Sequence, residues 1–470
     1  MADDRCVWAS EKLFYGIPLQ IGQVGAIIPS GDSHITSFVL KLFGSIAFHR
    51  FLHNPKYSNM LEFRDDYLIH IDSIVNTEIV KDIDYVGFVD WNVRDFHSFD
   101  TFHGATYNSY LIQDEKTAVI DSVKTQYVSY QIRNIADKVP LDNVDYVVCN
   151  HAEPDHAGGI AALLEYLPKA QLLCNVKCKD ILTDYFKGVV NKWNVRVVSP
   201  DDAVSLGKRT LRFINTPMVH WPESMFTYLP EEQLLFSMDA FGQHIATSGR
   251  FDDQQDLPEI LRAAKSYYAN IVTPYGKQVQ AVLKAAADLP VKMIAPSHGV
   301  IWRTHQQKIL ELYQQWSAGV QSKKILVVYD SMWESTSMMA QSIFEGATSV
   351  SDELDVQMIH IRKNCLTDIA AEMLDAAGAV FGSPTLNMQM MPHLSSVLTY
   401  IKGLKFSPKA AFAFGSYGWS SGGAEQIDKW IDDIGWKKIC QPVKCRFKPD
   451  TNILKLCFNE GVKLAQTILK

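Results

Sequence analysis

The first two thirds of the chain alternate short apolar runs with polar turns. Runs rich in β-branched and aromatic residues predict strands at 85–91, 106–112, 117–121, 144–149, 171–175, 195–198 and 234–238. Two further segments, 160–167 and 179–186, have the apolar spacing of helices. Turn residues at 207–208 and 230–232 predict hairpins. Because several strands follow one another without a helix between them, the pattern predicts a sandwich-like α/β fold rather than a plain doubly wound sheet.

A second pattern starts beyond a predicted linker at 316–322. Residues 324–330 form a continuous apolar run that predicts a buried strand, and a helix is predicted to start near Met338. Two more predicted strands begin at Ala379 and Ala411, and glycine, proline, aromatic or amide residues follow each of them. This spacing predicts a second α/β unit with parallel strands.

Composition narrows the class of protein. A chain of 470 residues suggests roughly three domains, and 47% hydrophobic with 21% charged residues is typical of a globular protein. The formal net charge of -7 gives no electrostatic support for a nucleic-acid partner. The best membrane candidate, 35–48, is short and contains Lys41, so no membrane partner is expected. The acidic residues at the amino terminus lack the basic start of a secretory signal, and the cytoplasm is the expected location.

The eight cysteines are scattered and form no CxxC pair of the zinc-ribbon or rubredoxin type. Cys174 and Cys178 are four residues apart, and Cys440 and Cys445 are five apart. Buried free thiols in a reducing compartment are therefore expected.

One loop, residues 150–159, concentrates the candidate chemistry. It follows a predicted strand and precedes a predicted helix, at the strand end where α/β proteins usually hold their functional groups. Within six residues it offers His151, Glu153, Asp155 and His156. In extended backbone the first three point the same way and His156 points elsewhere, so one loop can serve two adjacent metal ions. The alternative is a solvated polar loop in which Asp155 caps the helix.

Three more candidate ligands, His220, Asp239 and His298, each follow a predicted strand. Taken alone, each of them fits a buried core residue whose polar atoms are hydrogen-bonded. Together with the loop they make four histidines and three carboxylates, which is enough for two metal ions once exogenous oxygen ligands are added.

This ligand pattern resembles the metallo-β-lactamase superfamily in the version used by flavodiiron proteins. Zinc hydrolases of the superfamily ordinarily have histidine at the second motif position, where this chain has Glu153. The added carboxylate favours iron over zinc. The resemblance implies two iron sites and one bridging ligand: His151, Glu153 and His220 for the first iron, Asp155, His156 and His298 for the second, and Asp239 for the bridge. Whether His156 binds iron or swings away is left open.

The second unit contains three candidate flavin loops. Residues 331–337 are rich in hydroxyls and precede a predicted helix, whose N–H groups attract phosphate. They resemble the flavodoxin phosphate loop, and the loops after the strands at 379 and 411 resemble those that hold the isoalloxazine ring. One terminal phosphate favours FMN over FAD, and without a G-x-G-x-x-G turn NAD(P)H is not expected to bind. The predicted FMN-binding residues are Ser331, Met332, Trp333, Ser335, Thr336, Pro384, Thr385, Leu386, Asn387, Ser416, Tyr417, Gly418, Trp419 and Gly422.

The resemblance covers residues 79–470. It implies a metallo-β-lactamase-like αββα sandwich at 79–318 and a flavodoxin-like doubly wound parallel sheet at 323–470. Residues 1–78 are left as an extension of unknown role. Its His49 and His53 are four apart, but no third ligand of matching spacing follows.

The resemblance implies a reductase of dioxygen to water, of nitric oxide to nitrous oxide, or of both. Two ferrous ions and reduced FMN together hold the four electrons that dioxygen needs. The resemblance also implies a head-to-tail homodimer or a tetramer. Since no rubredoxin-type cysteine set is present at the carboxyl end, the expected electron donor is external, a rubredoxin-like protein or a flavin reductase.

Two other functions are considered. One is a zinc hydrolase fused to a flavodoxin-like domain; Glu153 and the absence of any need for flavin in hydrolysis argue against it. The other is an electron carrier with an inert first domain, which the complete ligand set disfavours. Near the candidate ligands, Trp221, Met225 and Phe241 either form an apolar wall of the site or pack in the core.

Overall fold

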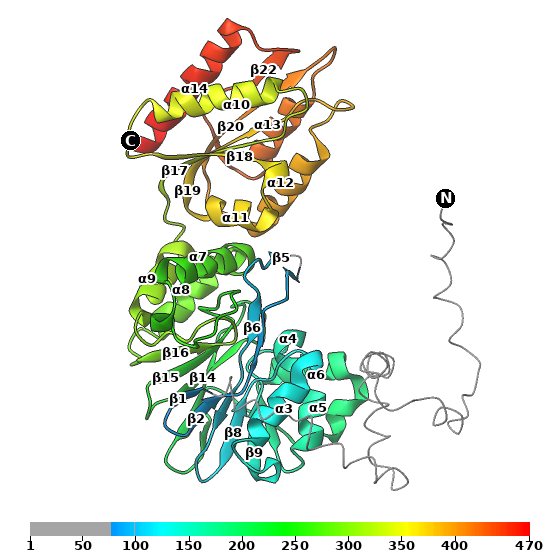
Figure 1. The fold of residues 1–470 in the computed structure, drawn as a ribbon, viewed down its shortest axis with the longest axis vertical. Helices are drawn as coiled ribbons and strands as arrows, with labels where there is room; N and C mark the ends of the chain where they lie inside the picture. The colour runs from blue at the N-terminus through cyan, green and yellow to red at the C-terminus, as the bar shows by residue number, and fades with distance from the viewer. Residues whose placement is uncertain (1–76, 98) are drawn as a thin grey trace, which may run out of the picture. The chain divides into compact units, whose positions relative to one another are not determined.

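Two β-sheets pack face to face in the first part of the described chain, and helices cover their outer faces (Figure 1). The computed structural model describes residues 77–97 and 99–470. The predictions for His49, His53 and most of the extension therefore lie outside the described residues.

The first sheet combines antiparallel strands at one edge with parallel strands at the other. Its order is β1 (Glu78–Val80), β2 (Ile83–Tyr85), β7 (Tyr110–Ile112), β8 (Thr117–Ile120), β9 (Val144–Val148), β10 (Gln171–Cys174) and β11 (Val195–Val197). The second sheet is mainly antiparallel. Its order is β12 (Ala203–Ser205), β13 (Thr210–Asn215), β14 (Met225–Leu229), β15 (Leu234–Met238) and β16 (Met293–Pro296).

Neighbouring side chains along each strand point to opposite faces of the sheet, so each sheet packs against the other sheet on one face and against helices on the other. Val148 of β9 packs in the core between the sheets, whereas Val147 packs under the helices of the first sheet. These helices are α3 (Val128–Ala136), α5 (Ile160–Tyr166) and α6 (Val176–Phe186). In β14, Met225 likewise packs in the core between the sheets, whereas Phe226 packs under the helices of the second sheet. These helices are α7 (Leu257–Tyr267), α8 (Gly276–Ala285) and α9 (Gln306–Ser317).

Two predicted strands are each split in the structure. The run at 106–112 becomes β6 (Ala105–Tyr107) and β7. Between them, Asn108 donates its backbone N–H to the carbonyl oxygen of Ser297 and its side-chain N–H₂ to the carbonyl oxygens of Pro296 and Gly299. The run at 85–91 likewise becomes β2 and β3 (Phe88–Asp90), and β3 pairs with β6 in a separate ribbon. A second ribbon joins β4 (Asp95–Phe96) to β5 (Phe99–Asp100).

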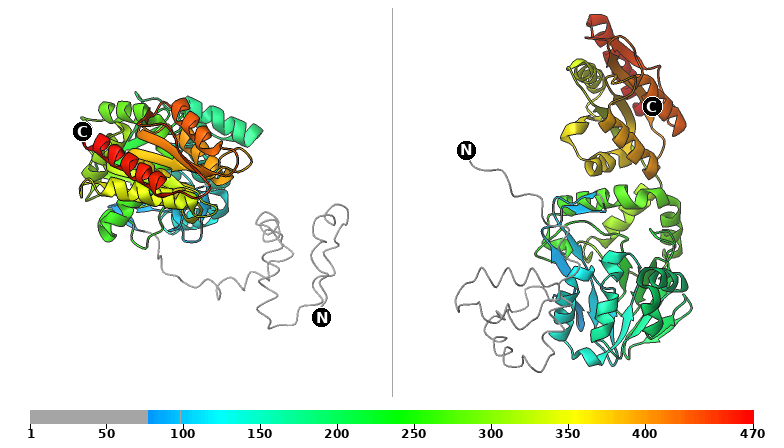
Figure 2. Two further views of the ribbon diagram at one scale, coloured as in Figure 1. Left: turned by 90° about the horizontal axis from the view of Figure 1, so that it is seen from above. Right: turned by 90° about the vertical axis from the view of Figure 1, so that its right-hand side faces the viewer.

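The second part of the chain is a parallel sheet with helices on both faces. Its order is β18 (Asp355–His360), β17 (Ser322–Tyr329), β19 (Ala376–Gly382) and β20 (Ala410–Tyr417), and β20 also pairs with β21 (Lys437–Lys438) and β22 (Val443–Arg446). One face packs against α10 (Ser335–Thr348) and α14 (Thr451–Leu469), which lie side by side (Figure 2). The other face packs against α11 (Leu366–Asp375), α12 (Pro392–Leu404) and α13 (Gly423–Asp433).

The predicted fold class, a sandwich followed by a doubly wound parallel sheet, is confirmed, with two local corrections in addition to the split strands. The connection between the two parts is shorter than the predicted linker, because α9 continues to Ser317 and Trp316 packs its ring against Tyr268 and Tyr313. The helix after β17 begins at Ser335 rather than near Met338.

The expectations about membrane-spanning segments and about cysteines can be checked within the described ranges. None of the helices there combines the length and apolarity needed to span a membrane. The described cysteines are free, and most are buried, as predicted.

Candidate metal centre

A buried hydrogen-bond network fixes the start of the His151 loop. Asp121, at the end of β8, accepts hydrogen bonds from the backbone N and Nδ2 of Asn150 at 2.7 and 3.0 Å. Thr227 of β14 donates to Oδ1 of Asn150 at 2.7 Å. The loop is therefore tied to both sheets one residue before His151. Glu153 then precedes the short helix α4 (Pro154–Ala157), and Pro154 suits its first position because its φ is already helical.

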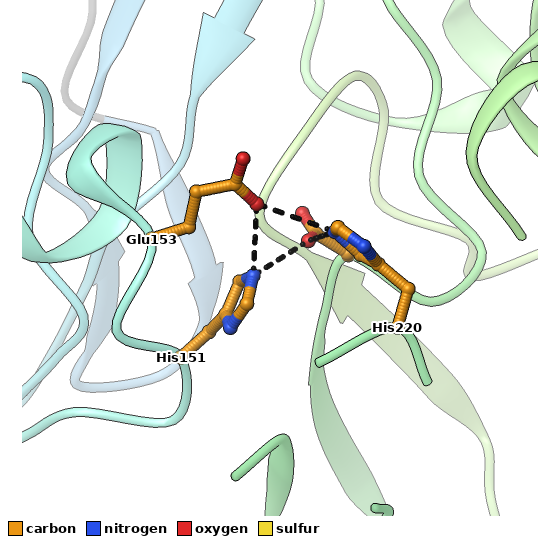
Figure 3. Close-up of side chains that lie close together, drawn as sticks. His151, Glu153 and His220 are labelled. Atoms are coloured by element: carbon orange, nitrogen blue, oxygen red, sulfur yellow. Dashed lines mark hydrogen bonds and ion pairs between the residues drawn. The ribbon is translucent and has the colours of Figure 1, made fainter. Parts of the chain in front are cut away.

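The seven predicted ligands come together in two adjoining groups. In the first group, His151, Glu153 and His220 point toward one another (Figure 3). Oε2 of Glu153 lies 3.1 Å from Nε2 of His151 and 3.2 Å from Nε2 of His220. The second group contains Asp155, His156 and His298. Oδ2 of Asp155 lies 3.3 Å from Nε2 of His156 and 3.1 Å from Nε2 of His298.

Asp239, which follows β15, joins the two groups. Its Oδ2 lies 3.2 Å from Nε2 of His151 and 3.0 Å from Nε2 of His220. Its Oδ1 lies 3.0 Å from Nε2 of His156 and 3.3 Å from Nε2 of His298. One buried carboxylate therefore faces histidines of both groups, which is the geometry expected of a bridging ligand.

Outer hydrogen bonds orient two of the imidazole rings. Nδ1 of His151 is 2.7 Å from Oε1 of Glu223, and Nδ1 of His298 is 2.6 Å from the carbonyl oxygen of Thr106. Each contact leaves Nε2 turned toward the centre, as metal-binding histidines require. Glu223 was missed by the sequence analysis because it has no ligand spacing; only the fold brings it to His151.

The donor atoms fit metal ions. Among the described residues, Oδ1 of Asp155 is buried without a hydrogen-bond partner. The buried Nε2 of His156 and Oδ1 of Asp239 lie 3.0 Å apart but do not form a well-aligned hydrogen bond. Leaving buried polar atoms unpaired is costly, and metal ions would satisfy all three. A set of imidazole nitrogens and carboxylate oxygens suits iron and zinc. His156 also points into the centre, so its ring is available as a ligand.

Histidines and carboxylates in the centre stabilise one another's charged forms. Burial raises the pKa of Glu153, but its hydrogen bonds with His151 and His220 outweigh burial and lower it to about 2. Burial opposes the charged form of His298, yet its contacts with Asp155 and Asp239 raise the pKa to about 10. A metal ion therefore displaces protons from the imidazoles when it binds.

A cavity of about 210 Å³ opens onto the centre. Its apolar walls come from Phe96, Phe99, Tyr267 and Ile271. The candidate wall residues Trp221, Met225 and Phe241 are not among its lining residues: Met225 lies in the core between the sheets, and Phe241 packs on Tyr313. The wall comes from the β4–β5 ribbon, the end of α7 and the helical turn 268–272 that follows it, and no motif connects these segments to the candidate ligands.

The predicted flavin loops lie together at the carboxyl edge of the parallel sheet, after β17, β19 and β20. Oγ1 of Thr336, in the first turn of α10, is 3.0 Å from Oγ of Ser416, and the backbone N of Thr385 donates to the carbonyl oxygen of Ser416 at 2.8 Å. Trp333 and Trp419 are 84% and 89% exposed. Hydroxyls beside a helix N-terminus and open indole faces fit a flavin phosphate and a flavin ring.

The comparisons with known proteins agree with this arrangement. Residues 105–299 match the family model described as ODP family beta lactamase, and residues 327–461 match Flavodoxin. The chain is 40% identical over 399 residues to a nitric oxide reductase of Moorella thermoacetica, covering 83% of this chain and 98% of that protein.

Two solved structures have the same fold. The flavodiiron protein from Giardia intestinalis has a TM-score of 0.81 at 36% identity and covers 84% of this chain and 97% of its own. The rubredoxin oxygen:oxidoreductase from Desulfovibrio gigas has a TM-score of 0.81 at 34% identity and covers 84% of this chain and 98% of its own.

Fold and site thus define a metallo-β-lactamase-like domain with a candidate two-metal centre, joined to a flavodoxin-like domain. The likeness to these relatives runs through both domains and through nearly their whole length. The chain belongs to the flavodiiron protein family.

Proposed function

We propose that the chain is a reductase of nitric oxide to nitrous oxide, of dioxygen to water, or of both, acting at a diiron centre that receives electrons from FMN. The observation that carries the proposal is Asp239, whose two oxygens each face histidines of a different ligand group. The relatives support the substrate class, since one is named a nitric oxide reductase and another an oxygen oxidoreductase.

We propose the following ligands for the two irons: His151, Glu153 and His220 for one, Asp155, His156 and His298 for the other, and Asp239 for both. Of the three groups of mutually close donor atoms among the described residues, two match this division; the third combines Glu153 and Asp155 with the exposed His97. Glu153 favours iron over zinc because a carboxylate is a harder ligand than the histidine it replaces.

Bound iron and FMN would supply the electrons, four for each dioxygen reduced to two water molecules and two for each pair of nitric oxide molecules coupled to nitrous oxide. The residues of the chain provide the surroundings. Phe96, Phe99 and Ile271 give the cavity apolar surface that suits a small diatomic gas. Burial holds the pKa of Tyr267 well above its ordinary value, so the hydroxyl keeps its proton beside the centre.

FMN is the proposed flavin, held by the three loops at the carboxyl edge of the parallel sheet. The link between Thr336 and Ser416 and the exposed rings of Trp333 and Trp419 support the assignment. The proposed domain bounds are 79–318 and 323–470, supported by the end of α9 at Ser317 and the start of β17 at Ser322.

A head-to-tail homodimer or a tetramer and an external electron donor, a rubredoxin-like protein or a flavin reductase, complete the proposal. Family membership supports both. Analytical ultracentrifugation tests the assembly, and a monomer at micromolar concentration would contradict it.

The decisive experiment is metal and flavin analysis of the purified protein, followed by anaerobic reduction and separate assays with dioxygen and nitric oxide. Two irons and one FMN per chain with fast gas consumption are expected. Glu153→Ala should lose gas consumption and keep FMN, whereas Glu165→Ala, exposed on α5, should behave as the unaltered protein. Zinc in place of iron, with no gas consumed after iron reconstitution, would instead favour the zinc hydrolase.

A further inference from the structure

The two candidate iron positions have matching ligands but different outer contacts. Apart from the shared Asp239, each position offers two histidines and one carboxylate. Behind His151 stands a carboxylate, because Oε1 of Glu223 is 2.7 Å from Nδ1. Behind His298 stands an uncharged group, because Nδ1 donates to the carbonyl oxygen of Thr106 at 2.6 Å.

Burial and hydrogen bonds hold Glu223 in position. Its side chain and that of His151 are both fully buried. Oε1 also accepts the backbone N–H of Ala152 at 3.0 Å, and Nδ2 of Asn175 donates to the backbone carbonyl of Glu223 at 2.6 Å. The other oxygen, Oε2, is buried and has no hydrogen-bond partner within the described residues.

A carboxylate behind a metal-bound imidazole acts on the metal through the ring. It accepts the Nδ1 proton, which makes Nε2 a stronger donor, and its charge favours the higher oxidation state of the ion. An uncharged carbonyl has a weaker effect of the same kind. The iron held by His151 should therefore be harder to reduce than its neighbour.

Two neighbouring groups act in the opposite direction. One is the buried carboxyl of Asp121, whose charge acts on His156 more strongly than on His151. Its hydrogen bonds go to Asn150, whereas Glu223 contacts Nδ1 of His151 directly.

The other group is His97. Nδ1 of His97 lies 3.1 Å from Oε1 of Glu153 and withdraws electron density from the iron position of His151. The side chain of His97 is 40% exposed, whereas His151 and Glu223 are completely buried. Water screens the exposed pair much more than the buried one, so the contribution of Glu223 dominates.

We propose that Glu223 is a positioning residue that makes the two irons inequivalent, so that the iron held by His151 is the last to be reduced and the first to be reoxidised. The proposal rests on the proposed diiron function. Each reduction would move one electron from reduced FMN to a ferric ion, and each reoxidation would pass one electron from a ferrous ion to the gas. The half-reduced centre then holds ferric iron at the His151 position and ferrous iron at the His298 position.

The substitution Glu223→Gln removes the negative charge behind His151 and keeps the size and hydrogen-bond acceptor of the side chain. The amide oxygen can still accept from His151 and Ala152, and the amide nitrogen takes the place of the unpartnered Oε2. Redox titration of the holoprotein, followed by the electron paramagnetic resonance signal of the half-reduced centre, gives the two iron potentials. The lower potential should rise and approach the upper one, while the FMN potentials stay unchanged. Glu165→Gln, exposed on α5, is the control and should leave all of them in place.

Unchanged iron potentials, or an equal shift of both, would overturn the proposal. A measurement on the unaltered protein keeps it testable if the variant does not fold. Anomalous diffraction across the iron edge from half-reduced crystals should give the ferric edge position at the His151 site, and the reverse assignment would also overturn it. Metal analysis separates failure of the proposed function from failure of this inference. Zinc without iron in the purified protein would overturn the proposed function, whereas two irons of equal potential would overturn only this inference.

Discussion

Nδ1 of His97 lies 3.1 Å from Oε1 of Glu153, although His97 belongs to the turn between β4 and β5 and Glu153 to the loop after β9. With φ at 54°, His97 has a left-handed backbone conformation in that turn. The contact holds the carboxylate at the edge of the cavity and leaves Oε2 directed toward His151 and His220.

We predict that His97→Ala weakens iron retention, because Glu153 loses the partner that fixes its orientation. Loss of an outer hydrogen bond to a metal ligand typically costs about tenfold in affinity or activity. Competition with a ferrous chelator measures the loss. His103→Ala is the matched control, since His103 is an exposed histidine of the same region that pairs with Glu259 at 3.8 Å and touches no ligand. Equal iron retention in both variants would contradict the prediction.

The residues that come together in the candidate centre were predictable from the sequence because they are concentrated in a motif and at strand ends. His151, Glu153, Asp155 and His156 lie within six residues, and the other three candidate ligands follow apolar strands. The outer partners were not predictable. Glu223 and His97 are single residues in loops, and their relation to the ligands depends on how the sheets and ribbons pack.

Asp239→Asn should remove a ligand from at least one of the two metal positions. An amide offers one oxygen and one N–H₂ group, so it can face only one ligand group as an acceptor, whereas each oxygen of Asp239 now faces two histidines. We expect the iron content to fall to about one ion per chain or less, with FMN retained. Asp180→Asn, exposed on α6, should keep the iron content of the unaltered protein, as measured by elemental analysis. Full iron occupancy in Asp239→Asn would exclude a bridging role.

Three central strands of the second part were predictable from the sequence, whereas β18, β21, β22 and the contacts among the loops were not. Apolar runs at 324–330, 379–382 and 411–414 identify buried parallel strands. The hydrogen bond from the backbone N of Gly423 to Oγ1 of Thr385, at 3.1 Å, joins two loops that are far apart in the sequence. Such contacts follow from strand register, which no local pattern fixes.

Gly422→Ala should weaken FMN binding. A Cβ atom at Gly422 would meet the backbone carbonyl oxygen of Met388, so the neighbouring turn at 386–389 would have to shift. That turn belongs to the proposed flavin site. We expect the dissociation constant for FMN to rise about tenfold, which corresponds to about 1.4 kcal/mol, in a fluorescence titration of the flavin-free protein.

Gly403→Ala provides the control for this experiment. A Cβ atom at Gly403, in α12, would meet nothing within 4 Å, so FMN binding should be unchanged. Equal affinity of the two variants would show that the turn tolerates displacement and would argue against its role in holding the flavin.

Lys409, just before β20, makes the stability of the protein depend on pH. Its side chain is buried, donates from Nζ to the carbonyl oxygen of Ala376 at 2.6 Å, and lies near the ring of Trp436. Burial lowers the pKa of Lys409 from 10.5 to about 7. Between these values the unfolded chain binds a proton that the folded chain does not, so the free energy of unfolding should rise as the pH increases from about 7 to 10.5.

Lys409→Met should therefore stabilise the protein at pH 8. One pKa unit corresponds to about 1.4 kcal/mol, so removing the charge gains about 3 kcal/mol, of which the unpaired carbonyl of Ala376 offsets about 1 kcal/mol. The net gain of about 2 kcal/mol should appear as a higher midpoint of thermal unfolding. It should shrink as the pH rises toward and beyond 10.5, where the lysine of the unfolded chain also loses its proton. Lys402→Met, exposed on α12, should leave the pH dependence unchanged. A variant that is less stable at pH 8, or whose advantage does not shrink with rising pH, would mean that the buried lysine is charged in the folded protein.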